Sequence, residues 1–325
     1  MRTLRMWLAL VAVLTGAASA QPAQSQVWPQ RPVKIIVPFA PGGNTDGIAR
    51  IVAQRLGDAF GQQFFVDNRP GAGGAIAAEA VARAPADGYT LFLTAVSVIA
   101  IVPAITKTPY DPAKDFAPIS VIGTNPYVLV VHPGMPANTL ADFVSYVRSQ
   151  PNKLSHAVAG LGGVGHLSMA LFLKRAGLDV IPVMYRGGGA PPLTDVIAGH
   201  IPIYLTGLSD AVPHATSGAL RLLAVSSEKR APQIPDVPTF IESGFPGFKA
   251  LTWNGLLAPA GTPKEIIDRI AKEIAGAVKD SKFIERLDSF GVDPLGNTPA
   301  EFAAMIAADI PFWAEAAKIA GVQEK

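Results

Sequence analysis

Two glycines near the start of the chain stand where a protein backbone could bind an anion. A β-branched run at Val33–Val37 breaks at Pro38, and Gly42 and Gly43 then precede apolar residues at helical spacing. A strand, a glycine loop and a helix start point unpaired backbone N–H groups and the positive end of the helix dipole at one place. Such a place attracts an anion. No Gly-Lys-Ser/Thr follows, which excludes a nucleotide-binding P-loop. We interpret the loop as half of a carboxylate site.

A second glycine loop, at residues 160–165, matches the pattern G-x-G-x-x-G between a predicted strand at 154–158 and a predicted helix. A dinucleotide site needs an acid at the end of the next strand, but Asp179 stands before that strand, at residues 180–184. The motif alone is weak evidence, and exported enzymes seldom depend on nicotinamide cofactors. We therefore expect no cofactor and favour a second anion-binding helix N-terminus. A glycine turn that binds nothing is the alternative.

Several side chains could add to these backbone donors. His166, near the start of the second helix, could donate to a carboxylate or fix the loop, and the sequence leaves both possibilities open. Arg186 follows another predicted strand and could pair with a carboxylate or cover the surface. Hydroxyls at residues 94–97 and 206–209 follow further strands in the equivalent position. The remaining histidines lack metal-ligand spacing, so we expect no metal.

Catalytic motifs are nearly absent from the chain. No Asp/Glu pair stands out as an acid–base couple, and the lack of cysteine excludes a thiol nucleophile. Residues 207–211 resemble the nucleophile elbow of hydrolases but lack its last glycine. The sequence therefore favours a binding protein over an enzyme. An exported hydrolase that uses Ser209 or His166 on a small carboxylate ester is the alternative.

The elements that must position these loops alternate between strand and helix. This order predicts an α/β fold with mainly parallel sheets flanked by helices. Two long extended segments would cross between domains. They are residues 116–132, hinged at 123–126, and residues 248–259, with a polar break at 253–255.

These crossings would leave domain 2 (residues 127–250) inserted into domain 1 (residues 33–126 and 251–325), with the ligand cleft between them. The C-terminal part contains amphipathic helices, preceded by predicted capping boxes that begin at Thr262 and Thr298. We expect these to be covering helices that carry no chemistry.

The N-terminus carries the features of an export signal. Basic residues precede an apolar run at residues 7–14, and small residues at 18–20 form a cleavage site before Gln21. The run is too short to span a bilayer, which needs about 20 residues. We expect a signal peptide at residues 1–20, cleaved after Ala20, and a soluble mature chain in the periplasm.

Composition limits the possible partners further. The chain contains no cysteine, so no disulfide supports an exported fold. The 27 basic and 25 acidic residues become equal in number once Arg2 and Arg5 leave with the signal peptide. No basic stripe is interleaved with aromatic residues, which argues against a nucleic-acid partner. The mature length suffices for two domains.

Ordered motifs from about Val33 to Val322 resemble the Bug/TctC family, the extracytoplasmic solute-binding proteins of tripartite tricarboxylate transporters. They are PVKIIVPFAPGGNTD, VDNRPGAGG, PADGYTL, YDPAKDFAPIS, the loop before His166, YRGGGAP, LRLLAVSSEKR, IPDVPTF and WNGLLAPAGTP. The resemblance implies a type II periplasmic-binding-protein fold, whose two domains close around one small ligand, mostly a carboxylate. Backbone N–H groups, hydroxyls and bridging waters would hold it. The implied partner of this monomer is a membrane permease or a sensor domain.

By the same resemblance, the ligand contacts fall in five segments. They are Phe39, Ala40, Pro41, Gly42, Gly43, Thr45 and Asp46; Thr94 and Ser97; Gly162, Gly163 and His166; Tyr185 and Arg186; and Thr206. Family members usually carry serine at the position of Gly163 and often at Val158, and commonly carry Asp at Thr206 and Glu at Ala170. These departures predict a less polar and less negative pocket. Such a pocket suits a larger or more apolar acid, such as an aromatic carboxylate or a dicarboxylate, rather than a ligand with an amino group.

Overall fold

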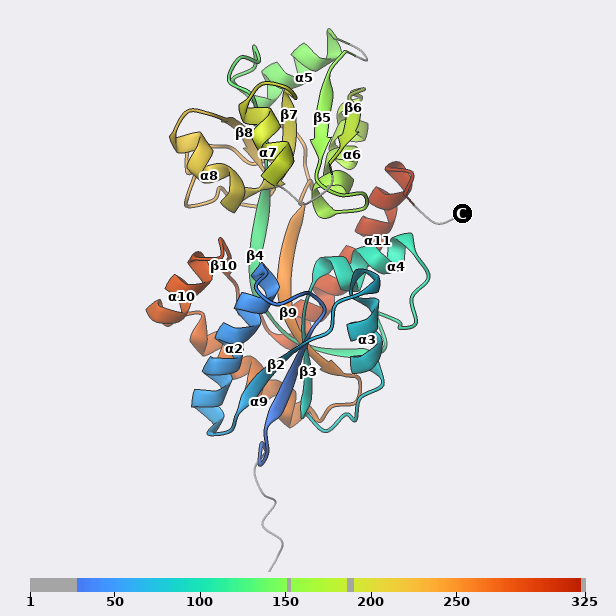
Figure 1. Ribbon diagram of the computed structural model, residues 1–325, viewed down its shortest axis with the longest axis vertical. Coiled ribbons are helices and arrows are strands. Elements are labelled where there is room, and N and C mark those ends of the chain that lie inside the picture. Colours follow the sequence, from blue (N-terminus) through green and yellow to red (C-terminus); the bar gives the residue numbers. More distant parts are fainter. Residues whose placement is uncertain (1–27, 151–152, 186–189, 323–325) are drawn as a thin grey trace, which may run out of the picture.

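The computed structural model describes residues 28–150, 153–185 and 190–322, so the expected signal peptide and Arg186 lie outside the described residues (Figure 1). The elements are, in chain order, β1 (Val33–Val37), α2 (Asn44–Phe60), β2 (Phe64–Asn68), η1 (Ala72–Gly74), α3 (Ala75–Ala82), β3 (Thr90–Ala95), η2 (Ser97–Ile101), α4 (Val102–Ile105), β4 (Phe116–Val131), α5 (Leu140–Arg148), β5 (Ser155–Val158), α6 (Val164–Ala176), β6 (Ile181–Met184), α7 (Ala190–Ile197), β7 (Ile203–Gly207), α8 (Leu208–Thr216), β8 (Arg221–Val225), β9 (Leu251–Pro259), α9 (Lys264–Ala277), α10 (Ser281–Asp288), β10 (Asp293–Pro294) and α11 (Pro299–Ile319). They form two α/β lobes, one above the other in Figure 1. None of the helices in the described ranges is long and apolar enough to cross a membrane.

The lower lobe is built on a sheet with the strand order β2-β1-β3-β9-β4, and β10 pairs with β4. β1 pairs in parallel with β2 and β3, whereas β9 runs antiparallel to β3 and β4. Side chains of β1 alternate between the two faces of the sheet. Ile35 lies in one buried cluster with Ile48 and Leu56 of α2, and Ile36 lies in another with Val81 of α3. Helices therefore cover both faces, and α2 begins beyond the carboxyl end of β1.

The upper lobe contains a second mixed sheet. In it β4 pairs antiparallel with β7 and β8, while β5 pairs in parallel with β6 and β7. Leu129 of β4 lies in a buried cluster with Phe172 of α6, and Val130 lies in another with Leu208 of α8. The expected parallel pairing is confirmed for β1–β3 and for β5, β6 and β7. The sheets are mixed because β4 and β9, the strands that connect the lobes, pair antiparallel with their neighbours.

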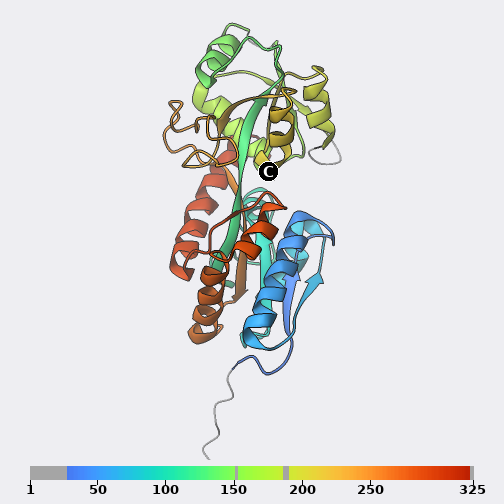
Figure 2. The same ribbon diagram turned by 90° about the vertical axis from the view of Figure 1, so that its left-hand side faces the viewer.

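One continuous strand, β4, runs through both lobes (Figure 2). The sequence predicts two strand segments here, whereas the structure has one, because Gly123 to Pro126 stay paired with β9 and the strand continues with β7 from Tyr127. Gly123 has a packing role instead: a side chain there would collide with Val292 and Asp293 beside β10. The glycine marks a close contact and not a break in the strand.

The polar break predicted at residues 253–255 is likewise part of a strand. Trp253 and Asn254 are both buried in β9. Trp253 Nε1 donates to Asp309 at 2.7 Å, and Asn254 Oδ1 accepts from Thr45 Oγ1 at 2.8 Å. Partners distant in the chain therefore satisfy polar groups that resemble a loop in the sequence alone.

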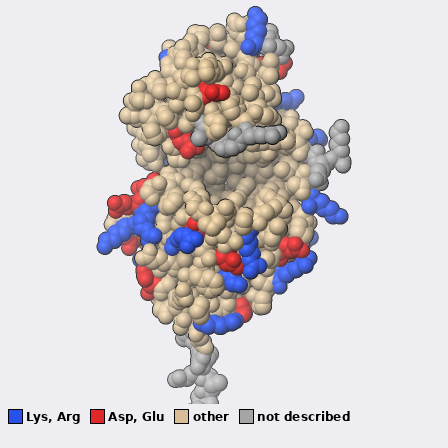
Figure 3. Space-filling model, in the orientation of Figure 1, with Lys and Arg blue, Asp and Glu red and all other residues tan. Residues whose placement is uncertain are grey.

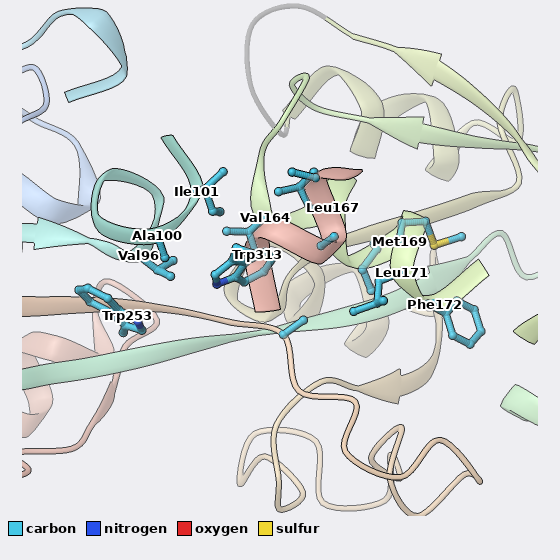
Figure 4. Close-up of a cluster of buried hydrophobic side chains, with 14 of the residues drawn as sticks. Val96, Ala100, Ile101, Val164, Leu167, Met169, Leu171, Phe172, Trp253 and Trp313 are labelled. Carbon is cyan, nitrogen blue, oxygen red and sulfur yellow. The ribbon is translucent and has the colours of Figure 1, made fainter. Parts of the chain in front are cut away.

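The C-terminal helix α11 is a third connection between the lobes. It begins in the lower lobe at the predicted capping box of Thr298 and Glu301, which is confirmed. Its far end packs on α6 of the upper lobe. Trp313 lies in one buried cluster with Ile101 of η2 and Val164 of α6 (Figure 4). The helix therefore packs on both lobes, which its apolar periodicity alone does not reveal.

The capping box predicted at Thr262 is also wrong. Helix α9 begins after Pro263, which is its N-cap residue and has no capping side chain. The hydroxyl of Thr262 donates instead to the carbonyl of Pro259 at 2.8 Å. Thr262 thus satisfies a carbonyl at the end of β9 and does not cap the helix.

Candidate ligand-binding site

The first glycine loop leads into α2 at the edge of the lower lobe that faces the upper lobe (Figure 1). Gly43 is the N-cap residue in an extended conformation, and no side chain caps the helix. Gly42 has a φ of 87°, a backbone conformation that favours glycine. The N–H groups of the first turn of a helix have no intrahelical acceptors. Those of α2 are therefore available to a ligand.

The buried side chain of Asp46 stabilises this loop by hydrogen bonds. Its carboxylate, only 2% exposed, accepts hydrogen bonds from Gly42 N–H (2.9 Å), Arg50 Nε (3.0 Å) and Asn68 Nδ2 (3.0 Å). Asn68 Nδ2 also donates to the carbonyl of Phe39 at 3.0 Å. Burial alone would raise the pKa of the Asp46 carboxyl, but the hydrogen bonds outweigh burial and lower that pKa. The sequence predicts a ligand contact here, whereas in the structure both carboxylate oxygens hold the loop.

The lower wall is the part of the lower lobe that faces the upper lobe. Its other residues that were predicted to contact the ligand divide into surface and interior positions. Residues 40–43 are exposed, and Phe39 is half-buried. Thr45 is buried and bonded to Asn254. Thr94 of β3 is fully buried, and its hydroxyl has no hydrogen-bond partner among the described residues. Ser97, half-buried, begins η2. The exposed part of this wall is therefore mainly backbone.

The second glycine loop presents a similar helix start in the upper lobe. Gly163 is the N-cap residue of α6, again extended and without a capping side chain. Gly162 has a φ of 73°, and the Gly163 N–H donates to the carbonyl of Gly160 at 3.1 Å. A side chain at Gly162 would meet Ile105 of the lower lobe at 3.0 Å. This loop therefore already lies against the lower lobe.

His166 has two roles in this loop. Its Nδ1 accepts a hydrogen bond from the Gly162 N–H at 3.1 Å, which places the proton of the neutral ring on Nε2. Burial lowers the pKa of His166, so the ring is neutral at pH 7. The sequence left open whether His166 fixes the loop or donates to a ligand. The structure shows that it fixes the loop, and the Nε2–H remains as a donor.

A cavity of about 230 Å³ lies between the start of α6, β7 and the start of α8. It brings together three predicted residues, Gly163, His166 and Thr206. Side chains that the sequence analysis did not select also line it, namely Tyr127, Tyr204 and Asp210. Figure 3 shows the hollow between the two lobes, lined mainly by uncharged residues.

Asp210 is the acidic group in this cavity. It is the third residue of α8, which starts at the N-cap residue Gly207 without a capping side chain. Partial burial raises the pKa of its carboxyl. Asp210 follows Thr206 closely in the sequence, within residues 207–211, the segment that resembles a nucleophile elbow. This position is the signal that could have identified it. The expectation of a less negative pocket did not take this residue into account.

Tyr185 does not line this cavity. Its hydroxyl donates to Asp195 of α7 at 2.6 Å. Burial and this hydrogen bond raise the pKa of Tyr185 to about 12. The predicted residues of the lower lobe do not line the cavity either; they belong to the other side of the space between the lobes.

Ser209 lies in a different space. It lines an open groove of about 900 Å³ between the lobes, together with Asn44 of α2 and Phe290. Here the lobes touch, since a side chain at Gly291 would collide with Ser209. Ser209 and His166 thus line separate cavities, which is unfavourable for a serine–histidine pair. In the described part of the chain, no group of three or more His, Asp or Glu side chains is placed to bind a metal.

Comparisons with known proteins agree with this arrangement. A family model described as the tripartite tricarboxylate transporter family receptor matches residues 48–319. The structure of R. palustris Rpa4515 with adipate is 38% identical, with a TM-score of 0.74, and the match covers 91% of this chain and 99% of that one. MatC from Rhodopseudomonas palustris with bound malate is 32% identical, with a TM-score of 0.69, over 89% of this chain and 99% of that one.

A third structure is of a TctC solute binding protein from Polaromonas without ligand. It is 27% identical, with a TM-score of 0.83, over 90% of this chain and 99% of that one. The family and these structural neighbours are solute-binding proteins and not enzymes. The chain therefore belongs to the tripartite tricarboxylate transporter receptor family, the TctC family of periplasmic solute-binding proteins.

Proposed function

We propose that this protein captures one small carboxylate between its lobes and delivers it to a membrane partner. The observation that carries the proposal is the pair of uncapped helix starts. α2 and α6 each begin at a glycine N-cap, on the two sides of the space between the lobes. In contrast, side chains cap α5, α10 and α11. An uncapped helix start offers N–H donors and a partial positive charge, which a carboxylate complements.

Each wall would supply hydrogen-bond donors rather than full charges. In the upper lobe these are the first N–H groups of α6 and the Nε2–H of neutral His166. In the lower lobe they are the N–H groups of α2, held in place by Asp46. Hydrogen bonds to an ionised acceptor are about twice as strong as neutral ones. The adipate and malate bound to the two neighbouring proteins support a carboxylate ligand.

Capture would close the lobes around the ligand by bending where the chain crosses between them. The order of TM-scores supports an arrangement of the lobes nearer to that of a ligand-free relative. The ligand-free Polaromonas protein scores 0.83 at 27% identity, whereas the adipate-bound protein scores 0.74 at 38% identity. Identity alone would predict the opposite order.

The proposed domains follow from the same crossings. Domain 1 comprises residues 33–126 and 251–325, and domain 2 comprises residues 127–250. The change of partner of β4 from β9 to β7 between Pro126 and Tyr127 supports this boundary. The end of α11, which packs on α6, is the main contact that crosses it.

The site of action follows from the export signal. We place the mature chain, cleaved after Ala20, in the periplasm as a monomer. Its partner would be the permease of a tripartite tricarboxylate-type transporter or a sensor domain, and family membership supports this choice. Closure of the lobes would report occupancy to that partner.

Two substitutions at Asn44 test the proposal. Asn44 is the first residue of α2, is exposed, and donates from Nδ2 to the Phe290 carbonyl at 2.8 Å. Asn44→Pro removes the side chain and the backbone N–H, whereas Asn44→Ala removes only the side chain. Proline is favoured at the first position of a helix, and the extended backbone of Gly43 accepts a following proline. Both variants should therefore fold.

Isothermal titration calorimetry of the refolded mature chain with adipate, malate and benzoate measures the effect. We expect at least one of these carboxylates to bind, and Asn44→Pro to weaken it by roughly 10- to 100-fold, as for a lost hydrogen bond to a charged group. Asn44→Ala should stay within about threefold of wild type. Equal affinities of the two variants, or no binding of any carboxylate to the wild type, would contradict the proposal.

A further inference from the structure

The cavity beside α6 is lined by groups of opposite character. The uncapped start of α6 and the Nε2–H of His166 present donors. Asp210 presents a carboxylate, close to the phenols of Tyr127 and Tyr204. Both kinds of group line one cavity of about 230 Å³, so a single small ligand can contact both.

A matched pair of aspartates shows that Asp210 is unusual. Asp46 and Asp210 are each the third residue of a helix that starts at a glycine N-cap. Asp46 accepts hydrogen bonds from Gly42, Arg50 and Asn68. Among the described residues, no hydrogen bond or ion pair satisfies the Asp210 carboxylate. The same residue type in the same local position is thus buried and fully hydrogen-bonded in one wall. In the other it is exposed and has no side-chain or backbone partner in the described ranges.

Asp210 is an exposed residue, and none of the described side chains around it pairs with its carboxylate. Burial and the negative charge of Asp210 raise the pKa of Tyr127 and of Tyr204, so both phenols stay neutral. Among the described residues that line the cavity, none is Lys or Arg. Within the described part of the chain, no residue donates a hydrogen bond to the Asp210 carboxylate, which can therefore accept one from a ligand.

We infer that Asp210 selects carboxylates whose far end donates hydrogen bonds, such as amino acids and hydroxy acids, over dicarboxylates of the same length. The inference rests on the proposed function, since the carboxylate end must bind at the start of α6. A second carboxylate at the far end would meet Asp210 as a like charge, which disfavours it. This selectivity differs from the preference for apolar acids or dicarboxylates that the sequence predicts from Thr206.

Matched ligands of equal length test the inference. The probes are adipate, 6-hydroxyhexanoate and 6-aminohexanoate, with succinate, 4-hydroxybutanoate and 4-aminobutanoate as the shorter series. Calorimetry at pH 7.5 compares the refolded wild type with Asp210→Asn and with Asp58→Asn. Asp58 is an exposed acid near the far end of α2, away from the cavity, and its variant has the same change in net charge.

In the series that fits the cavity, the wild type should bind the amino or hydroxy acid at least about tenfold more tightly than the diacid. Asp210→Asn should reduce this ratio about tenfold, and Asp58→Asn should leave it unchanged. A wild type that prefers the diacid, or a ratio that Asp210→Asn does not change, would overturn the inference and leave the proposed function intact. If no carboxylate of either series binds the folded wild type, the proposed function fails and the inference fails with it.

Thermal unfolding separates a ligand-selecting role from a purely structural one. The raised pKa means that the folded state disfavours the charged form of Asp210. Asp210→Asn should therefore raise the melting temperature above the pKa of this carboxyl, and the gain should disappear as the pH falls below 3.8, the ordinary value for aspartate. If Asp210 served mainly to stabilise the start of α8, the substitution would lower the melting temperature instead.

Discussion

The two walls of the cleft begin their helices with the same device and support it differently. In the lower wall, Asp46 and Asn68 tie the loop before α2 to its own helix and to β2. In the upper wall, the ring of His166 holds the loop before α6, and Asp210 at the start of α8 stays free. Both helices begin at a glycine N-cap, so the two walls differ in whether the nearby polar groups already have partners. The comparison teaches that groups with partners stabilise a wall, and we expect the groups without partners to contact the ligand.

Removing the Asp46 carboxylate, which stabilises the loop of the lower wall, should have the largest effect on stability. Asp46→Ala leaves the Gly42 N–H and Asn68 Nδ2 without their carboxylate acceptor, and each such loss costs about 1–3 kcal/mol. We expect the free energy of unfolding to fall by roughly 2–4 kcal/mol in urea denaturation. Arg50→Ala is the control, because the Arg50 side chain is 56% exposed and its ion pair should contribute only about 0–1 kcal/mol. Equal losses of unfolding free energy in both variants would show that the Asp46 carboxylate does not stabilise the loop through Gly42 and Asn68.

At the upper wall, His166→Asn separates the two roles of the ring. Asparagine retains an acceptor near the position of Nδ1 for the Gly162 N–H but lacks the distant Nε2–H donor. We expect a stability within about 1 kcal/mol of wild type and an affinity for the carboxylate lowered by about tenfold. His166→Ala should weaken binding similarly and lose about 1–3 kcal/mol of stability as well. An unchanged affinity of His166→Asn would restrict the ring to its role in the loop.

The smallest expected effect concerns Thr94, which lies behind the lower wall. Its hydroxyl is buried without a partner among the described residues, so Thr94→Val should leave stability unchanged or raise it by up to about 1 kcal/mol. We expect carboxylate affinity within about twofold of wild type in calorimetry, because Thr94 is fully buried. A clear loss of affinity would show that Thr94 contacts the ligand and would contradict the interior position described for it.

Local patterns in the sequence predicted the parts of the molecule that local chemistry determines. The strand Val33–Val37 and the helix after Gly43 follow from side-chain type and spacing, and both are confirmed. The same is true of the helix that begins after Gly163. The cavity then brought His166 and Thr206 together, as expected from their positions after neighbouring strands.

Features that depend on distant partners could not be predicted in this way. Gly123 resembled a break between two strand segments because the residues that pack against it, Val292 and Asp293, lie far along the chain. Asn254 resembled a loop residue because its partner, Thr45, is equally distant. Asp46 resembled a ligand contact because the sequence does not show that Asn68 occupies its carboxylate. In each case the sequence identified the polar or flexible residue but not the group that satisfies it.

Hydrogen exchange of the backbone tests the central claim most directly, because that claim is that both helix starts bind one ligand. The measurement compares the mature chain alone and saturated with the carboxylate that binds most tightly in calorimetry. We predict slower exchange at residues 44–46 of α2 and at residues 164–166 of α6, since a bound carboxylate protects the N–H groups that it accepts from. Protection confined to one of the two helix starts would contradict capture between the lobes.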